Sequence, residues 1–265
     1  MKIKLLPTLA SLFAIGMLRA FAQAPAVAVP ASTPVSVSAT TSVVSQYMFR
    51  GLRIGDGGFQ PAVEVSAGNG LIGVWAHVPF NGDKVPDSSD PEIDLYGAYT
   101  FTLDRGITLT PGFTSYHYPK APTDAGFYRA TFEPSLAVSG TIAGVKVTPK
   151  LYYDFVLKGL TTELTALYAL PLKNLGSELD FTATYGGYTW KESANHASPA
   201  VKSWGEYWLL SVAAPFQISR EARITVGVGY TEGRRAFTKA GNLGKVANSL
   251  AVGRGVVTLS YTRTF

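Results

Sequence analysis

The feature that most constrains the fold of this chain is a two-residue alternation of apolar and polar side chains, repeated in short runs from Val35 onward. The run Tyr128–Ser139, for example, places Phe132 on one face and Glu133 on the other. Such a period is typical of a β-strand with one apolar and one polar face. No segment of ten or more residues has the periodicity of an amphipathic helix. The pattern therefore predicts an all-β fold.

Gly, Pro, Asn and Asp separate the runs, as expected for turns between strands. Most runs are close to the length of about 9–11 residues that a tilted strand needs to cross a bilayer. The twelve runs are Val37–Arg50, Gln60–Ala67, Leu71–Phe80, Glu92–Thr102, Ile107–Tyr118, Tyr128–Ser139, Ile142–Phe155, Thr162–Leu170, Glu178–Tyr188, Tyr207–Phe216, Arg223–Thr231 and Arg254–Phe265.

The connections between the runs alternate in length. The tight ones are Gly68–Gly70, Leu103–Gly106, Gly140–Thr141, Pro171–Ser177 and Gln217–Ala222. The others are Gly51–Phe59, Asn81–Pro91, Pro119–Phe127, Lys191–Gly205 and Glu232–Gly253, with Leu157–Thr161 as a short exception. Short periplasmic turns and longer extracellular loops are typical of outer-membrane barrels, whereas a soluble exported β-sandwich has no reason to alternate them. We therefore predict a closed antiparallel transmembrane β-barrel of about 12 strands.

Aromatic residues gather near the ends of the runs, where an outer-membrane barrel carries the girdles that meet the two lipid interfaces. The sequence predicts girdle positions for Tyr47, Phe49, Phe80, Tyr116, Tyr118, Tyr185, Tyr188, Trp190, Tyr207, Trp208 and Tyr230. The last run ends on Phe265, and a terminal aromatic residue is expected to be recognised by the barrel-insertion machinery. Arg263, two positions before Phe265, stands where an apolar residue is expected.

The N-terminal segment has the pattern of a secretory signal peptide. Lys2 and Lys4 precede the apolar run Leu5–Leu18, and Ala20-Phe21-Ala22 offers small residues for cleavage before Gln23. The apolar run is shorter than the ~20 residues of a membrane-spanning helix. We predict a signal peptide over residues 1–22, a Pro/Ala-rich periplasmic lead-in over 23–34 and the barrel over 35–265. These features predict export to the outer membrane of a Gram-negative cell.

Charge and cysteine content exclude several functions. Removal of the signal peptide would leave 20 basic residues against 18 acidic ones, with no basic cluster interleaved with aromatic residues. A nucleic-acid partner is therefore not expected. The absence of cysteine excludes disulfides and thiolate metal sites. We expect no cofactor, no metal and no catalytic residues.

The polar face of each strand is expected to line the barrel lumen. Five basic and five acidic side chains fall on that face by phase, so we expect a neutralised, partly salt-bridged interior: a narrow pore whose lining tunes passage, or an ion-pair network that fills the lumen. The candidates are Arg50, Glu64, Asp94, Arg129, Glu133, Lys146, Lys150, Asp154, Asp180 and Arg223. Arg50 is expected to form a bidentate structural clamp with Asp94 or Glu64, and a contact with substrate is the alternative.

The segment Ser45–Leu52 (SQYMFRGL) resembles the Y-x-F-R-G start of the TorF-type porin family. Four further pieces follow in that family's order: Gln60–Val63, Gly70–Trp75, Glu92–Tyr96 and Ser115–Pro119. Together they cover about a third of the chain that would remain after cleavage. The resemblance implies an outer-membrane location and a transport role, and it implies no catalytic residue and no particular substrate.

The function expected from these observations is that of a porin or narrow diffusion channel for small solutes. Two alternatives stay open beside it: a lipid-modifying enzyme, for which Ser115 and His117 share one face of a strand, and a structural or adhesion barrel that conducts nothing. The expected partners are small solutes, outer-membrane lipids and lipopolysaccharide, whose phosphates could meet Arg234, Arg235, Lys239 and Lys245.

Overall fold

A computed structural model describes residues 35–80, 91–121, 123, 128–191 and 201–265. The predicted signal peptide and lead-in lie outside these residues. The strands are β1 (Val35–Phe49), β2 (Leu52–Ala67), β3 (Gly70–Pro79), β4 (Glu92–Tyr99), β5 (Phe101–Thr102), β6 (Thr108–His117), β7 (Ala130–Ile142), β8 (Val145–Asp154), β9 (Gly159–Leu172), β10 (Ser177–Trp190), β11 (Val201–Gln217), β12 (Ala222–Ala240), β13 (Val246–Ala247) and β14 (Gly253–Thr264). Short 3-10 turns, η1 (Asp104–Gly106) and η3 (Lys173–Leu175), lie in two of the connections.

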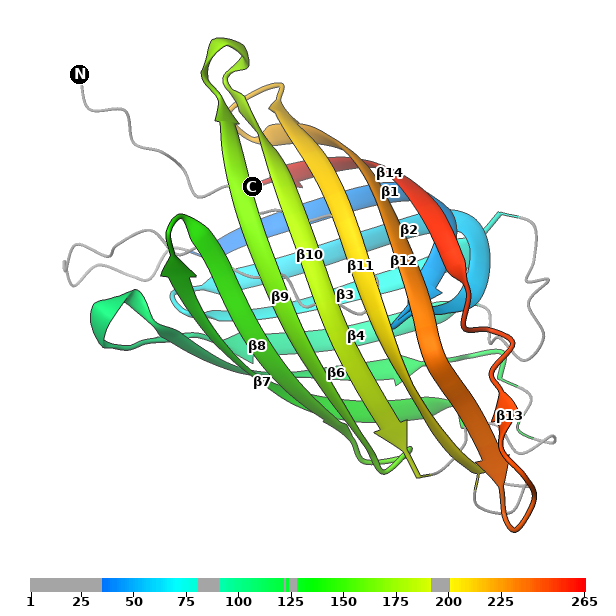
Figure 1. The fold of residues 1–265 in the computed structure, drawn as a ribbon. Helices are drawn as coiled ribbons and strands as arrows, with labels where there is room; N and C mark the ends of the chain where they lie inside the picture. Colours follow the sequence, from blue (N-terminus) through cyan, green and yellow to red (C-terminus); the bar gives the residue numbers. More distant parts are fainter. Residues whose placement is uncertain (1–34, 81–90, 122, 124–127, 192–200) are drawn as a thin grey trace.

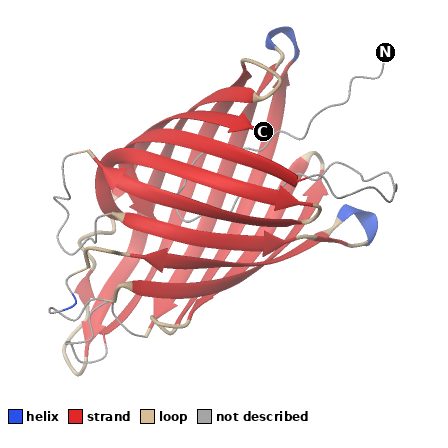
Figure 2. Cartoon of the chain, turned by 180° about the vertical axis from the view of Figure 1, so that it is seen from behind, coloured by secondary structure: helices blue, strands red, loops and turns tan. Residues whose placement is uncertain are grey.

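The strands form one antiparallel sheet that closes on itself (Figures 1 and 2). β5 and β13 have two residues each, and the other twelve of the fourteen strands form the ring. Each strand of the ring pairs with the next along the chain, and β12 pairs with both β11 and β14. The ring closes where β14 pairs with β1, from Ser38 opposite Thr264 to Val44 opposite Thr258. The predicted twelve-stranded closed antiparallel barrel is therefore confirmed.

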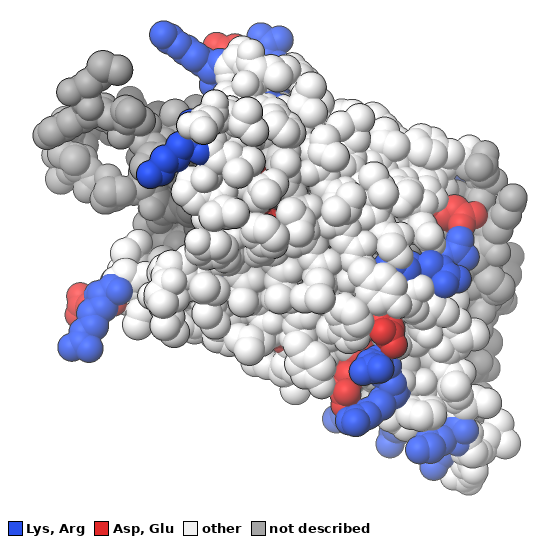
Figure 3. All heavy atoms as spheres, turned by 45° about the horizontal axis from the view of Figure 1, so that its top comes forward, with Lys and Arg blue, Asp and Glu red and all other residues white. Residues whose placement is uncertain are grey.

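The two faces of the sheet have opposite chemistry. In β1, Thr40 and Ser42 are buried inside the barrel, whereas Thr41 and Val43 are exposed on the outside. The same alternation runs through the ring, because successive side chains of a strand point to opposite faces. On the face drawn in Figure 3, charged side chains gather toward the two ends and leave a wide uncharged zone between them. Around the whole barrel, the exposed apolar residues of the outer face include Val43, Val63, Ile72, Val74, Leu95, Leu136, Val138, Leu151, Leu164, Phe181, Leu210, Val226, Val228, Val257 and Leu259.

The five connections that the sequence predicts to be tight lie at one end of the barrel, which we call the turn end. The beginning of β1 and the C-terminus also lie there, since Val37 and Phe265 exchange backbone hydrogen bonds. The opposite end, which we call the loop end, carries the other connections. Two predictions of long loops are wrong in detail. In the expected loop Gly51–Phe59, all residues from Leu52 onward belong to β2, which begins after the two-residue turn Arg50-Gly51. β12 continues to Ala240, so strand pairing extends far into the expected loop Glu232–Gly253.

The aromatic girdle prediction is only partly right. Phe80, Tyr185 and Tyr230 are exposed on the outside, as expected of residues that meet lipid. The structure instead buries Tyr47, Tyr116, Tyr188 and Tyr207 inside the barrel. The physical reason is strand phase. These four side chains share the inward face with polar residues, and the hydroxyl groups of Tyr47, Tyr116 and Tyr207 find carboxylate acceptors there.

Arg263 is explained by its place at the turn end. It lies on the outward face beside buried Thr262, and its guanidinium stands 5.1 Å from the centre of the Phe265 ring. Arg263 Nη2 also lies 3.6 Å from Glu221 Oε2, across the edge of the barrel. The charge is therefore placed at the rim, where the expected lipid boundary permits it. No helix among the described residues is long and apolar enough to cross a membrane.

Candidate functional site

The candidate site is built on the turn between β1 and β2. Arg50 and Gly51 form this two-residue turn, closed by the pairing of Phe49 with Leu52. Both turn residues have positive φ, 50° for Arg50 and 75° for Gly51. Positive φ at both central residues is the requirement of a type I′ hairpin turn. A non-glycine residue in this region is uncommon, so the position of Arg50 requires support from its surroundings.

The hairpin leaves the barrel wall and enters the lumen. β1 pairs with β14 only as far as Val44, and the next contact there is a hydrogen bond from the backbone N–H of Val257 to Ser45 Oγ, 2.9 Å long. The tip instead approaches β11 and β12. A side chain placed on Gly51 would lie 2.6 Å from the Cα of Gly233 and 2.7 Å from the Cβ of Tyr207. Figure 1 shows the blue β1–β2 hairpin curling inward at the loop end.

Gly233 is the matching position on β12. A Cβ atom there would lie 2.4 Å from the carbonyl oxygen of Gly51. The two glycines therefore permit an approach of backbone to backbone that no larger residue would allow. A bridge between Leu52 and Ala251 and a hydrogen bond of 2.8 Å from Arg53 N–H to Leu250 O also hold the tip against the chain that leads into β14.

Apolar contacts fix the hairpin in this position. Leu52 packs in a buried cluster with Tyr188 and Tyr207, and Met48 packs with Leu209 and Val256. Met48 is fully buried and Leu52 is 5% exposed. Burial of a side chain of this size contributes about 1.5–3 kcal/mol. The hairpin is thus a packed part of the barrel interior.

Arg50 reaches the opposite wall. Its Nη1 and Nη2 donate hydrogen bonds of 2.8 and 2.7 Å to the two carboxylate oxygens of Glu133 on β7. The strands β2, β3, β4 and β6 separate β7 from β1 in the ring, so this bidentate pair spans the lumen. The guanidinium also lies 4.6 Å from the centre of the Phe49 ring and 4.7 Å from that of Tyr152. Tyr116 Oη donates a further bond of 3.1 Å to Glu133.

A second buried carboxylate lies beside this pair. Glu163 on β9 accepts hydrogen bonds from Tyr152 Oη and from Tyr207 Oη, the latter 2.5 Å long. The Nζ of Lys150 stands 4.4 Å from the centre of the Tyr152 ring. Tyr207 therefore contacts both the turn glycine and Glu163. We call Arg50, Tyr116, Glu133, Tyr152, Glu163 and Tyr207 the hairpin network.

The network continues along the lumen wall toward β3 and β4. Tyr47 Oη donates a hydrogen bond of 2.9 Å to Glu92 Oε2. Gln60 and His77 share a hydrogen bond of 3.1 Å, and the Tyr47 and His77 rings are 4.4 Å apart at their centres. All four residues are buried. Aromatic and ionisable groups therefore surround the hairpin, both where it meets the far wall and along its sides.

Toward the turn end, short hydroxyl side chains form part of the lining of the lumen. Hydroxyl groups from neighbouring strands pair across the inward face at distances of 2.7 to 3.1 Å. The pairs are Thr40 with Thr262, Ser42 with Ser260, Thr100 with Thr110, Ser139 with Thr148 and Thr165 with Thr184. We call these ten residues the hydroxyl wall. Their side chains are short and reach only as far as the neighbouring strand.

The predicted lumen residues divide into three groups. Arg50 and Glu133 form the central pair, and Lys150 lies beside it. A second group lies elsewhere on the inward face. Buried Glu64 accepts a hydrogen bond from Tyr96, and buried Asp94 lies on β4. Buried Asp180 lies near half-buried Arg223, and Lys146 is also half-buried. Two have other surroundings: buried Asp154 accepts the backbone N–H groups of Val156 and Leu157 in the β8–β9 turn, and exposed Arg129 precedes β7.

The predicted partner of Arg50 was wrong. Glu64 on β2 and Asp94 on β4 lie on strands close to β1 in the ring, so they were the partners expected for a hairpin that stays in the wall. Because the tip folds across the lumen, Arg50 meets Glu133 instead. The sequence reasoning also missed Glu163, although the phase of its run, with Thr161 and Thr165 on the same face, places it inside.

The serine and histidine considered for catalysis are in contact. Ser115 Oγ and His117 Nε2 lie 2.9 Å apart on the outward face of β6. The residues paired with His117 on the neighbouring strands are Ile93 and Ala130. Neither can orient the imidazole as the acid of a triad does. The pair therefore lacks the orienting acid of a catalytic triad on the strands beside it. Among the described residues, no group of three or more potential ligands is placed to hold a metal ion.

The fold and the site together define a closed β-barrel with an apolar exterior and an ionisable interior into which its first hairpin is folded. The chain belongs to the Gcw_chp family of bacterial proteins of unknown function, whose model matches residues 28–163. The matched region contains the Y-x-F-R-G segment and all of β1 to β8. No curated protein matches the chain in sequence.

Several solved barrels are similar in overall shape. The NanC porin is 9% identical with a TM-score of 0.48, and the match covers 87% of this chain and 99% of that one. The KdgM porin is 12% identical with a TM-score of 0.47 over the same shares. An outer membrane channel from Pseudomonas putida F1 is 9% identical with a TM-score of 0.48, covering 90% and 97%. Similarities at this level establish neither a shared family nor a shared substrate.

Proposed function

We propose that this protein is an outer-membrane channel of low conductance for small solutes, constricted by its β1–β2 hairpin. The observation that carries the proposal is the pairing of two surfaces in one closed barrel: an apolar exterior that suits lipid and an interior lined by hydroxyl, carboxylate and guanidinium groups. A barrel satisfies every backbone group in lipid only when it is closed, and the ring of strands meets that condition.

The number of strands supports a narrow pore. Barrels of about eight strands are filled by their own side chains, and those of about sixteen enclose an open aqueous channel. A ring of twelve lies between them, and the hairpin network narrows it further. The resemblance to the TorF-type porins, which begins at the same hairpin segment and extends to Pro119, favours the same function. We also propose that exposed Phe265 is the residue that the insertion machinery recognises.

Recording from single molecules in planar lipid bilayers tests the channel directly. Protein whose folding is verified by heat-dependent migration on a gel should give small, resolved conductance steps. Folded protein that gives no steps over a range of voltages and salts would overturn the channel and leave a non-conducting structural barrel. Migration that heat does not alter would instead contradict the membrane barrel itself.

A further inference from the structure

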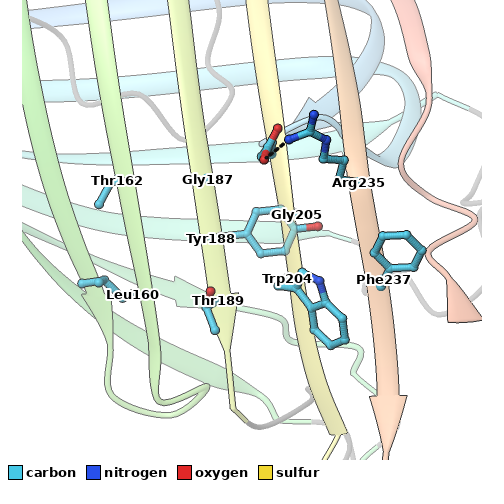
Figure 4. Close-up of a pocket in the computed structure, with 10 residues that line it drawn as sticks. Leu160, Thr162, Gly187, Tyr188, Thr189, Trp204, Gly205, Arg235 and Phe237 are labelled. Carbon is cyan, nitrogen blue, oxygen red and sulfur yellow. Dashed lines mark hydrogen bonds and ion pairs between the residues drawn. The ribbon is translucent and has the colours of Figure 1, made fainter. Parts of the chain in front are cut away.

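The outer face of β9 to β12 carries a groove at the loop end. It has a volume of about 500 Å³ and is lined by Leu160, Thr189, Trp204, Glu206, Arg235 and Phe237 among others (Figure 4). Gly187 also contributes to its lining, without a side chain to fill it. Because Tyr188 and Tyr207 of the same strands are buried inside, their neighbours Thr189 and Glu206 face outward. The groove therefore lies on the side of the wall that would meet lipid.

An aromatic pair forms one side of this groove. Trp204 on β11 pairs in register with Phe237 on β12, and their ring centres are 5.9 Å apart. The Nζ of Lys245 stands 4.5 Å from the centre of the Phe237 ring. Figure 4 shows the two rings side by side on the neighbouring strands. A flat aromatic surface beside an ammonium group suits a ligand that is partly apolar and partly anionic.

Two further lysines face each other beyond the aromatic pair. Lys202 and Lys239 are register partners on β11 and β12, and both are exposed. Like charges directly opposite each other destabilise an antiparallel pair of strands. Within the described residues, no ion pair joins either lysine to a carboxylate. An anion bound between the two ammonium groups would remove this repulsion.

The nearby arginines are already neutralised. Arg234 lies 3.2 Å from Glu232, and Arg235 lies 3.2 Å from Glu206. The excess positive charge of this region therefore comes from the lysines at positions 202, 239 and 245. They lie on the rim side of the aromatic pair, and exposed Leu160 lies level with that pair, since Leu160 pairs with Thr189 and Thr189 with Trp204.

We propose that this surface, formed by Lys202, Trp204, Phe237, Lys239 and Lys245, binds a phosphorylated glycolipid of the outer leaflet. The inference rests on the proposed outer-membrane location, in which the loop end faces the cell exterior. The phosphate groups contact the lysines, a sugar ring packs on Trp204 and Phe237, and the acyl chains lie along the apolar wall near Leu160. A lipid that combines phosphate groups, sugar rings and acyl chains in this way is the lipid A part of lipopolysaccharide.

Binding of defined lipids to the folded, detergent-solubilised barrel tests the site. The dissociation constant is measured for bisphosphorylated lipid A and for its chemically dephosphorylated form. We expect the native protein to prefer the phosphorylated lipid, and the variant Lys202→Gln/Lys239→Gln to bind it at least about tenfold more weakly. The matched control, Lys173→Gln/Arg220→Gln, removes two exposed charges at the turn end and should bind as the native protein does.

Equal affinity of the native protein and the Lys202→Gln/Lys239→Gln variant would overturn the site, as would equal affinity for the two lipids. Inorganic pyrophosphate separates the two sources of phosphate: if it displaces the lipid at a similar concentration, the site recognises phosphate and not a glycolipid. Trp204→Ala should weaken binding of both lipids, because the ring contacts the sugar. Channel recordings on the same preparations keep the two proposals apart, since the lysine variant should conduct as the native protein does.

Discussion

The two parts of the barrel interior differ in how far their side chains reach. The hairpin network brings Arg50 to the middle of the lumen, where it is held by Glu133 from the far wall. The hydroxyl wall uses short side chains that pair with the adjacent strand, such as Ser42 with Ser260 at 2.7 Å. One part therefore crosses the lumen, and the other only lines it.

This difference indicates which part of the proposed channel should limit the passage of solutes. In the proposed channel, we expect the paired hydroxyls to obstruct solute less than the hairpin network does, because each short side chain is satisfied by its neighbour. The hairpin network occupies the axis with an ion pair whose two side chains are 3% and 2% exposed. If the comparison is right, changes in the hairpin network alter conductance and stability strongly, and equivalent changes in the hydroxyl wall alter them little.

The largest effect is expected for Arg50→Ala. Removal of one partner from a buried ion pair leaves the other charge uncompensated, at a cost of about 3–5 kcal/mol. We expect a loss of this order in the free energy of unfolding, measured by denaturant titration in lipid vesicles. Removal of the guanidinium also widens the constriction and removes a positive charge, so single-channel conductance should rise and the reversal potential should shift toward cation preference.

The double variant Arg50→Met/Glu133→Gln is the control for that prediction. Replacement of both charges leaves no unpaired carboxylate, so much of the lost stability should return, while the raised conductance should persist. If Arg50→Ala left both conductance and stability unchanged, the ion pair would not be the constriction. Arg223→Ala offers a second comparison, because this half-buried residue lies toward the turn end and should affect both quantities less.

A smaller effect is expected from Gly51→Val. The positive φ of Gly51 costs a branched residue about 1–2 kcal/mol, and contact with Gly233 and Tyr207 adds about 1–3 kcal/mol of overpacking. Gly176→Val is the matched control, since Gly176 also has a positive φ, 59°, but nothing lies within 4 Å of its Cβ position. The difference in unfolding free energy between the two variants measures the packing of the hairpin against β12. Equal losses would mean that the tip is not packed there.

A third variant, Tyr207→Phe, removes one hydroxyl from the network. Hydrogen bonds to charged acceptors contribute about 1.5–3 kcal/mol, and Glu163 would keep its bond from Tyr152. We expect a loss toward the lower end of that range in the unfolding titration. Tyr230→Phe on the outer face serves as the control and should change stability by less. A larger loss for Tyr230→Phe would contradict the assignment of Tyr207 to the network.

The contrast between the two parts also explains what the sequence could predict. Inside and outside follow from strand phase, which depends only on neighbouring residues, so the twelve strands and the inward position of Glu133 and Lys150 follow from alternation. The path of the hairpin depends on contacts between residues far apart in the chain. Gly51 with Gly233 and Arg50 with Glu133 are such contacts, and no local pattern in a single sequence indicates them.

The aromatic residues illustrate the same limit. Tyr116 and Tyr207 lie near strand ends, where tyrosine commonly meets the lipid interface, and that association suggested a girdle. Phase places Tyr116 on the face of buried Thr114, and Glu133 supplies the acceptor for its hydroxyl. Strand phase is therefore the better guide than distance from the strand end, because it fixes which side of the wall a side chain occupies.

The smallest effect is expected in the hydroxyl wall. Ser42→Ala/Ser260→Ala removes both members of one hydrogen-bonded pair, and replacement of both partners by apolar groups is nearly neutral. We expect unfolding free energy to change by less than about 0.5 kcal/mol and conductance to stay close to the native value, because neither side chain reaches the axis. A conductance change as large as that of Arg50→Ala would place the constriction in the hydroxyl wall. The hairpin would then be a structural plug of the loop end, beside a passage that the paired hydroxyls control.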